Sequence, residues 1–207
     1  MGVLIRATAR HEPNALTVRM HIAHVSPSLY HDSACHEHAD IVETSGGTIV
    51  AETMPAQPRI VKLTPRPLTA ETFAEFGAVV GPDKLVLTST EFPFFTNLAT
   101  LPPENQPIRH INRHHDHQQI FCSVGGRPMI VIVASPKLSA ADLRIEDIQA
   151  FITDGNTAIV FHIDTWHLEP RAAGSKSMRA LNVQAINNHV HTERIELAPT
   201  YGVTLTV

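Results

Sequence analysis

The chain of 207 residues is 43% hydrophobic and 17% charged, which suffices for a sizeable core and excludes a wholly disordered protein. Its 16 basic and 20 acidic residues give a net charge of −4, so the strongly basic surface of a nucleic-acid or membrane-surface binder is absent. No apolar run approaches the roughly 18 residues that a membrane-spanning helix needs. The two cysteines, Cys35 and Cys122, are too few for a disulfide framework, and we expect a cytoplasmic protein.

Residues 1–57 differ from the rest of the chain. They hold six of the 14 histidines, and their apolar residues follow neither the strand period nor the helix period. They also lack the apolar segment and cleavage site of a secretory signal. We therefore predict a poorly ordered N-terminal extension over residues 1–57. Two alternatives stay open: a metal-loading segment at Cys35-His36-Glu37-His38, and a natural start at Met54.

A short helix is predicted after residue 68. Thr69 is a suitable N-cap, and Leu68 and Phe73 have the spacing of a hydrophobic staple. Gly77 is placed to end this helix in a left-handed C-cap.

Short strands and glycine turns dominate the remainder. The predicted strands cover residues 120–124, 129–134, 148–153, 157–162 and 181–184. The uninterrupted apolar run at 129–134 is typical of a strand buried on both faces, and Asp154-Gly155 predicts a hairpin turn. Many short strands with few helices favour an all-β sandwich or barrel.

Residues 181–184 alternate between apolar and polar side chains. Alternation with period 2 places Leu181 and Val183 on one face of a strand and Asn182 and Gln184 on the other. The pattern predicts that the two apolar residues are buried. If the opposite face lines a barrel, Asn182 and Gln184 are polar pocket residues.

Histidines gather in two places that carry chemistry. The first is the segment 112–119, and the second has Asp154-Gly155 followed by His162 and His167. Together they resemble the two motifs of the cupin fold, in which imidazole and oxygen ligands from neighbouring strands grip a divalent ion or a polar substrate. The resemblance implies a cupin-like β-barrel, or double-stranded β-helix, over residues 58–207 with one or two short helices. In this register His114, Gln119 and His167 point inward, and Asn112 stands where many metal cupins have another histidine.

The same residues resemble the ureidoglycolate lyase family of allantoin breakdown. The matching elements are Arg113-His114, Gln119-x-Phe121, residues 150–155, His162 and Trp166-His167. The resemblance covers about three quarters of the chain. It implies a carbon–nitrogen lyase that cleaves ureidoglycolate, a small molecule, to glyoxylate and urea, and that forms a homodimer.

Three residues are assigned to the reaction centre on this resemblance. His114 and His167 bind a metal or transfer protons, since imidazoles titrate near neutral pH, and Gln119 is a third ligand or a substrate hydrogen-bond partner. The metal, if used, is a divalent ion such as Ni, Mn or Zn. The alternative is a set of barrel histidines satisfied by their neighbours.

Further residues are candidates for substrate binding. Arg113 is a candidate for the substrate carboxylate, although strand alternation turns it away from His114, so a surface or dimer ion pair is the alternative. Trp166 either walls the pocket or packs in the core. His162 orients a ligand or caps a hairpin, and Asn182 and Gln184 line the pocket.

The remaining histidines of the cluster and two other functions stay open. His115 and His117 are either solvated loop residues or ligands that replace Asn112. The alternative functions are a different small-acid or sugar-acid cupin enzyme and a non-catalytic small-molecule-binding cupin.

Overall fold

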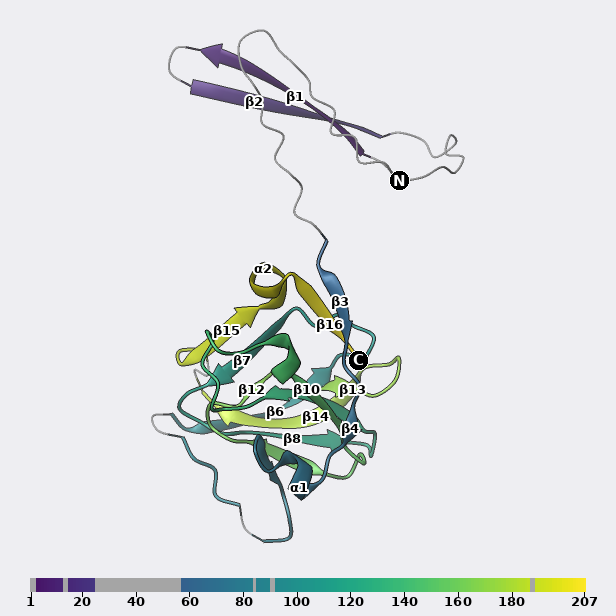
Figure 1. The fold of residues 1–207 in the computed structure, drawn as a ribbon, viewed down its shortest axis with the longest axis vertical. Coiled ribbons are helices and arrows are strands. Elements are labelled where there is room, and N and C mark those ends of the chain that lie inside the picture. The colour runs from purple at the N-terminus through teal and green to yellow at the C-terminus, as the bar shows by residue number, and fades with distance from the viewer. Residues whose placement is uncertain (1–2, 13–14, 25–56, 84, 90–91, 187–188) are drawn as a thin grey trace. The chain divides into compact units, whose positions relative to one another are not determined.

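The computed structural model describes residues 3–12, 15–24, 57–83, 85–89, 92–186 and 189–207 (Figure 1). The chain divides into two units, Met1–Met54 and Pro55–Val207. In the first unit, β1 (Val3–Glu12) pairs antiparallel with β2 (Ala15–His24), a hairpin that the sequence pattern did not predict. The proposed metal-loading segment at Cys35-His36-Glu37-His38 and the alternative start at Met54 lie outside the described residues.

The second unit is built from two main sheets. The five-stranded sheet has the order β5 (Gly77–Val79), β11 (Ala158–Phe161), β8 (Gln119–Val124), β14 (Met178–Ala185) and β6 (Phe94–Leu101). The seven-stranded sheet has the order β15 (Thr192–Glu196), β7 (His110–His114), β12 (Trp166–His167), β9 (Met129–Ala134), β10 (Gln149–Ile152) and β4 (Arg66–Pro67), with β13 (Arg171–Ala172) also paired to β9.

Few other elements complete this unit. Strands β16 (Val203–Thr206) and β3 (Arg59–Lys62) pair in parallel, and the helices are α1 (Ala70–Phe73), α2 (Leu197–Tyr201) and a 3₁₀ turn at Ile145–Asp147. No helix in the described part of the chain has the length and apolar character needed to cross a membrane. The predicted all-β, cupin-like fold is confirmed.

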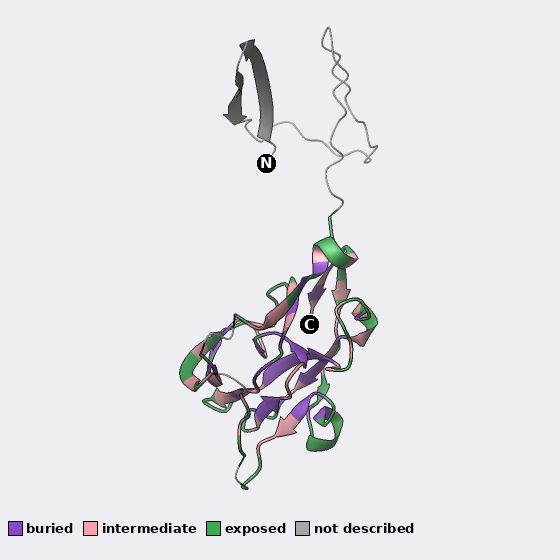
Figure 2. Cartoon of the chain, turned by 90° about the vertical axis from the view of Figure 1, so that its left-hand side faces the viewer, coloured by how far each residue is buried: buried purple, intermediate pink, exposed green. Residues whose placement is uncertain are grey.

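Strand β9 separates two apolar clusters. Met129, Val131 and Val133 pack into the cluster that also contains Phe121 and Phe161 of the five-stranded sheet. The alternate residues of β9 pack on the opposite side, against residues of α2 and β16. All six residues of β9 are buried, as the continuous apolar run predicted, and Figure 2 shows buried residues concentrated in the strands.

The start of helix α1 is as predicted, but its end is not. The Thr69 side chain accepts a hydrogen bond from the Thr72 amide at 3.1 Å, and the Thr72 hydroxyl accepts one from the Thr69 amide at 3.0 Å. Leu68 and Phe73 are both buried in the same cluster. Gly77 does not cap this helix in a left-handed conformation. It begins β5, where a Cβ atom would lie 2.0 Å from the Val160 carbonyl oxygen, so the close approach of β11 requires glycine.

Strand β14 is turned the opposite way from the prediction. Leu181 is 38% exposed, whereas Asn182 is only 4% exposed. The alternation itself is correct, but its polar face points between the two sheets and its apolar face points outward. A polar cavity therefore exists at this end of the core, and the conditional prediction for Asn182 and Gln184 applies.

The turn at Asp154-Gly155 does not close a hairpin. Its flanking strands belong to different sheets, because β10 pairs with β9 and β4 while β11 pairs with β5 and β8. The Asp154 carboxylate accepts hydrogen bonds from the amides of Asn156 and Thr157, each at 2.8 Å. Gly155 then packs on the backbone of Gly126 in the turn between β8 and β9, so the two crossings between the sheets support each other.

Replacing Gly155 by alanine is expected to destabilise the fold more than replacing Gly174. Both glycines have φ near +90°, but a Cβ on Gly155 would lie 2.2 Å from the Gly126 carbonyl oxygen, and one on Gly174 would meet nothing within 4 Å. Gly174→Ala should lower the free energy of unfolding by about 1–2 kcal/mol through backbone conformation alone. Gly155→Ala should lower it by roughly a further 1–3 kcal/mol through the clash. Denaturant unfolding measures both, and equal losses would contradict this packing.

Candidate active site

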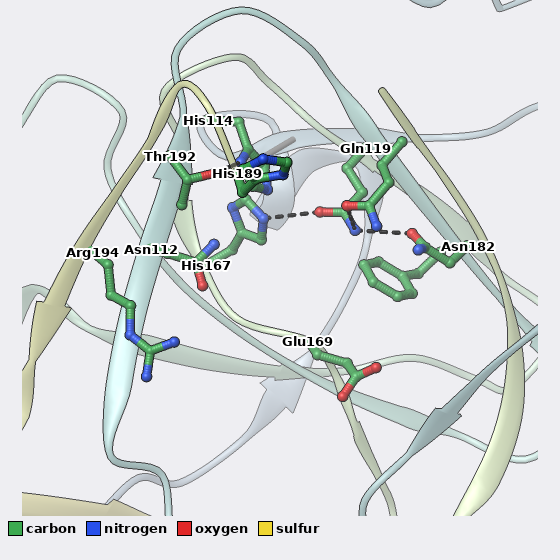
Figure 3. A pocket seen from close by; sticks show the side chains of 11 residues that line it. Asn112, His114, Gln119, His167, Glu169, Asn182, His189, Thr192 and Arg194 are labelled. Atoms are coloured by element: carbon green, nitrogen blue, oxygen red, sulfur yellow. Dashed lines mark hydrogen bonds between the residues drawn. The ribbon is translucent and has the colours of Figure 1, made fainter. Parts of the chain in front are cut away.

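A polar cavity of about 470 Å³ lies where strands of the two sheets face each other. The seven-stranded sheet contributes residues of β7, β12 and β15, and the five-stranded sheet contributes residues of β8 and β14. The lining residues are Asn112, His114, Gln119, Phe121, His167, Glu169, Asn182, Gln184, His189, Thr192 and Arg194 (Figure 3). The five predicted residues His114, Gln119, His167, Asn182 and Gln184 are therefore brought together.

His114 and His167 approach each other from neighbouring strands. Their ring centroids are 5.0 Å apart in an edge-on arrangement, and the His167 ring also stacks on Phe161 at 4.4 Å. The His114 Nδ1 atom lies 2.8 Å from the Thr192 hydroxyl, which is opposite it in the β15–β7 register. His167 Nδ1–H donates to the Thr165 carbonyl oxygen at 2.7 Å. Both rings are thus held in place through Nδ1, and their Nε2 atoms are left for other partners.

Side-chain amides form a row beside the two rings. The Gln119 amide donates from Nε2 to Asn182 Oδ1 at 2.9 Å and to Gln184 Oε1 at 3.1 Å. Asn182 Nδ2 donates in turn to Asn97 Oδ1 at 3.1 Å. We call Asn97, Asn182, Gln184 and Gln119 the amide row. It presents both donors and acceptors, as recognition of another amide requires.

Burial keeps both imidazoles neutral. Desolvation, followed by the charges of His167 and His117, lowers the pKa of His114 to about 2. Desolvation also lowers the pKa of His167 to about 4, against the smaller raising effect of the hydrogen bond to Thr165. At pH 7 each ring therefore has one nitrogen lone pair, and neither ring carries a positive charge.

The contact between His167 and Gln119 sets a constraint. His167 Nε2 lies 3.0 Å from Gln119 Oε1 (Figure 3). Since the neutral ring carries its proton on Nδ1, both atoms of this contact are acceptors. A cation bound by both atoms satisfies them, and so does a turn of the Gln119 amide that brings Nε2 to the ring. The site is thus suited to receive positive charge or a proton at this point.

The side chains of the cavity limit how a metal ion could be held. Among the described residues, no three His, Cys, Asp or Glu side chains are grouped to hold a metal ion. A metal here would therefore need the Gln119 amide oxygen in addition to His114 and His167. Neutral imidazole nitrogens and an amide oxygen are acceptable ligands for Ni²⁺, Mn²⁺ or Zn²⁺, and the two facing acceptors fit a shared cation.

Arg113 and Trp166 lie outside the cavity. Arg113 is next to His114 on β7 and points to the other face of the sheet, as alternation requires. Its guanidinium pairs with Glu193 at 2.7 Å, donates to the Leu138 carbonyl oxygen at 2.9 Å and lies 4.5 Å from the Trp166 ring centroid. Trp166 is fully buried, and its Nε1–H donates to the same carbonyl oxygen at 2.9 Å. These two side chains therefore stabilise the fold behind the site.

His162 and His115 also point elsewhere. The His162 Nε2 atom lies 3.3 Å from the Ala74 carbonyl oxygen, next to the end of α1. The His115 side chain is exposed and its Nδ1 atom lies 2.5 Å from a carboxylate oxygen of Asp164. The solvated alternative for His115 is thus the one that the structure contains.

His117 is 1% exposed, so the prediction of a solvated loop residue is wrong, and the alternative of a metal ligand stays a prediction. Its ring stacks on His114 with centroids 4.4 Å apart, and its Nδ1 atom lies 2.6 Å from Asp116. Its Nε2 atom and the second Asp116 oxygen are buried and have no partner among the described residues. Their position between strands β7 and β8 carried no sequence signal of burial.

Four other lining residues were not predicted. Thr192 and Arg194 alternate along β15, opposite His114 and Asn112 of β7, so strand pairing alone brings them to the cavity. Glu169 follows His167 by two residues, and burial raises the pKa of its carboxyl. His189 is exposed at the edge. The alternation of Thr192 and Arg194 indicates that both lie on one face of a strand. The sequence does not show that this strand pairs with β7.

The stability of the fold is expected to fall in mild acid because of the two neutral rings. Unfolded histidines bind protons below about pH 6.5, whereas folded His167 and His114 bind them only near pH 4 and pH 2. Each ring should therefore lower the free energy of unfolding by about 1.4 kcal/mol per pH unit between pH 6 and pH 4.5. His167→Gln and His114→Gln should each reduce that slope by this amount in denaturant unfolding. Unchanged slopes in both variants would show that the rings protonate freely.

The part of the chain that forms the cavity is similar to known proteins. Residues 88–203 match the sequence profile of the family described as "Ureidoglycolate lyase". The chain is 30% identical over 127 residues to the ureidoglycolate lyase of Pseudomonas fluorescens (strain Pf0-1), covering 51% of this chain and 74% of that protein. It is 28% identical over 123 residues to the ureidoglycolate lyase of Pseudomonas paraeruginosa (strain DSM 24068 / PA7), covering 49% and 70%. The matched region contains every residue that lines the cavity, and the chain belongs to the ureidoglycolate lyase family.

Proposed function

We propose that this chain cleaves ureidoglycolate to glyoxylate and urea. The observation that carries the proposal is a pair of neutral imidazoles beside an amide row in one polar cavity. The family and its named relatives support the same reaction class. The reaction moves one proton from oxygen to nitrogen and consumes no water, so it needs a proton carrier and binding groups for a ureido group and a carboxylate.

The polar lining matches the two ends of this substrate. A ureido group has a carbonyl acceptor and N–H donors, which the donors and acceptors of Asn182, Gln119 and Gln184 can pair with. Arg194 is the arginine of the cavity lining, and we assign the substrate carboxylate to it. Arg194 also pairs with Glu196, so the substrate carboxylate must compete with that residue, whereas Arg113 lies outside the cavity altogether.

The proposed proton carrier is His114. Its Nδ1 is held by Thr192, and Gln119 is a further side-chain hydrogen-bond partner of the ring, so Nε2 serves the substrate once Gln119 gives way. Nε2 accepts the proton of the substrate hydroxyl, and the O–H electron pair forms the aldehyde carbonyl as the carbon–nitrogen bond breaks. The electron pair of that bond goes to the urea nitrogen. The imidazolium then gives its proton to this nitrogen. The low pKa of His114 favours this return step and makes the first proton transfer correspondingly unfavourable.

Gln119 and His167 orient the reacting groups in this scheme. Gln119 connects β8 to His167 on the opposite sheet, and Asn182 fixes the other end of its amide. If His114, Gln119 and His167 hold a divalent ion instead, the ion would supply positive charge that polarises substrate oxygen atoms, and His114 would not carry the proton. The homodimer implied by the family resemblance stays a prediction, for which exposed Leu98, Val124 and Leu181 on the outer face of the five-stranded sheet provide apolar surface.

Substitution of either central histidine should remove turnover of ureidoglycolate. His114→Ala removes the proton carrier and His167→Ala removes the group that Gln119 contacts, so kcat/KM should fall by roughly 10²–10⁴-fold in each. Glyoxylate and urea are measured together, because equal amounts of both define a lyase. His115→Ala is the matched control, since that histidine is exposed and outside the cavity, and it should keep wild-type activity.

The outcomes separate the candidate functions. Ammonia in place of urea would identify a hydrolase. Activity retained in both cavity variants would refute the site. Binding of ureidoglycolate without any product would replace the enzyme with a small-molecule-binding protein.

Metal binding is tested separately from turnover. After treatment with EDTA and removal of the chelator, addition of Ni²⁺, Mn²⁺ or Zn²⁺ should raise the melting temperature of the wild-type protein by preferential binding to the folded state. The His114→Ala/His167→Ala double variant should lose that increase, while His115→Ala should keep it. An equal increase in the double variant would place the metal elsewhere.

A further inference from the structure

A second cavity adjoins the candidate active site and has a different charge. It has a volume of about 540 Å³, and Glu169 lines both cavities. Its polar lining comes from Arg109, Arg171, His110, Gln106, Thr100 and Glu169. Whereas neutral groups dominate the first cavity, two guanidinium groups face a single carboxylate here.

Arg171 is the unusual residue of this cavity. It lies on the short strand β13 and is only 8% exposed. Its Nε atom is buried and has no hydrogen-bond partner in the described ranges of the chain. Glu169 acts on Arg171 through its charge, but the two side chains form no ion pair in this structure.

A buried guanidinium N–H group without a hydrogen-bond partner is costly. Removal of a charge from water is repaid only by a close opposite charge and by hydrogen bonds to each N–H group. Arginine remains protonated at any physiological pH, so Arg171 cannot escape this cost by losing its proton. His110, whose pKa is lowered by burial and by the charge of Arg194, adds no further positive charge but can still form a hydrogen bond.

We propose that the second cavity binds a small oxyanion, a carboxylate or a phosphate, through the buried guanidinium of Arg171 and the exposed guanidinium of Arg109. Arg171 lines this cavity, and a turn of its guanidinium would offer the Nε–H that has no partner, together with a neighbouring Nη–H, to two oxygens of such an anion. Arg109 adds a second positive charge at the solvent-exposed side of the cavity. This site is additional to the ureidoglycolate site and does not require that the chain be a lyase.

Isothermal titration of the full chain tests this site without any turnover. Acetate and inorganic phosphate are the two probes, and sodium chloride at the same ionic strength is the reference. We expect saturable binding of one or both oxyanions beyond the effect of chloride, and the probe that binds identifies the anion class. Arg171→Met should weaken the binding by about tenfold or more, because a charge-assisted hydrogen bond is lost.

Three further variants keep the result interpretable. Arg109→Gln changes an exposed residue and should also weaken binding, so it decides the question if Arg171→Met fails to fold. Arg179→Gln is the matched control, since this exposed arginine of β14 lines neither cavity. His114→Ala should leave the anion affinity unchanged, because His114 belongs to the first cavity.

The proposal is overturned by any of three results. These are no binding beyond that of chloride, wild-type affinity in Arg171→Met or Arg109→Gln, and loss of binding in His114→Ala. None of them depends on ureidoglycolate turnover, so failure of the lyase assay and failure of this titration are independent.

Discussion

The candidate site depends on a contact that joins the two sheets. His167 belongs to the seven-stranded sheet and Gln119 to the five-stranded sheet, and their side chains meet at 3.0 Å inside the cavity. His167 Nδ1–H donates a hydrogen bond to the Thr165 carbonyl oxygen. The proton of the neutral ring is therefore on Nδ1, and the Nε2 atom that faces Gln119 is an acceptor. The protonation state of one ring therefore determines which end of the Gln119 amide is satisfied. This contact couples the two sheets more strictly than an apolar contact would. Two buried polar atoms that are both donors or both acceptors cost free energy, whereas an apolar pair has no such requirement.

The amide row transmits this constraint to the far side of the cavity. Gln119 cannot turn alone, because its Oε1 would then face the oxygens of Asn182 and Gln184. If Asn182, Gln184 and Asn97 all turn with it, Asn182 Nδ2 and Gln184 Nε2 donate to Gln119 Oε1, and Asn97 Nδ2 donates to Asn182 Oδ1. The row thus has two self-consistent directions, and a proton or cation at His167 favours one of them. A substrate with a ureido group, which has both donors and acceptors, can pair with the row in either direction.

Sequence patterns predicted the parts of the structure that depend on local periodicity. The continuous apolar run became β9, buried on both faces. His114, Gln119 and His167 line one cavity, as the resemblance to the cupin motifs implied. Alternation of Leu181 and Asn182 was also read correctly, but periodicity cannot say which face is inside. The polar face of β14 is buried because the site needs it, against the average preference of leucine for the core.

The sequence could not predict which residues reach the cavity through strand pairing. Thr192 reaches the cavity only because β15 pairs with β7, and the hydrogen bond to His114 follows from that register. His117 is buried by stacking on His114, which no spacing rule indicates. The Asp154-Gly155 turn was located correctly, yet local turn chemistry does not distinguish a hairpin from a crossing between sheets.

The separation of charge between the two cavities has a chemical consequence. The pKa values of His114 and His167 are low because both rings are buried among one another, so the first cavity presents no permanent positive charge from histidine. Carboxylate recognition therefore falls to arginines, which stay protonated when buried. Arg194 is half-exposed and paired with Glu196 at 2.6 Å, whereas Arg171 is buried with an unsatisfied Nε. The two arginines differ in what a ligand gains: at Arg194 an anion must compete with Glu196, and at Arg171 it relieves a desolvation cost that the folded chain already carries.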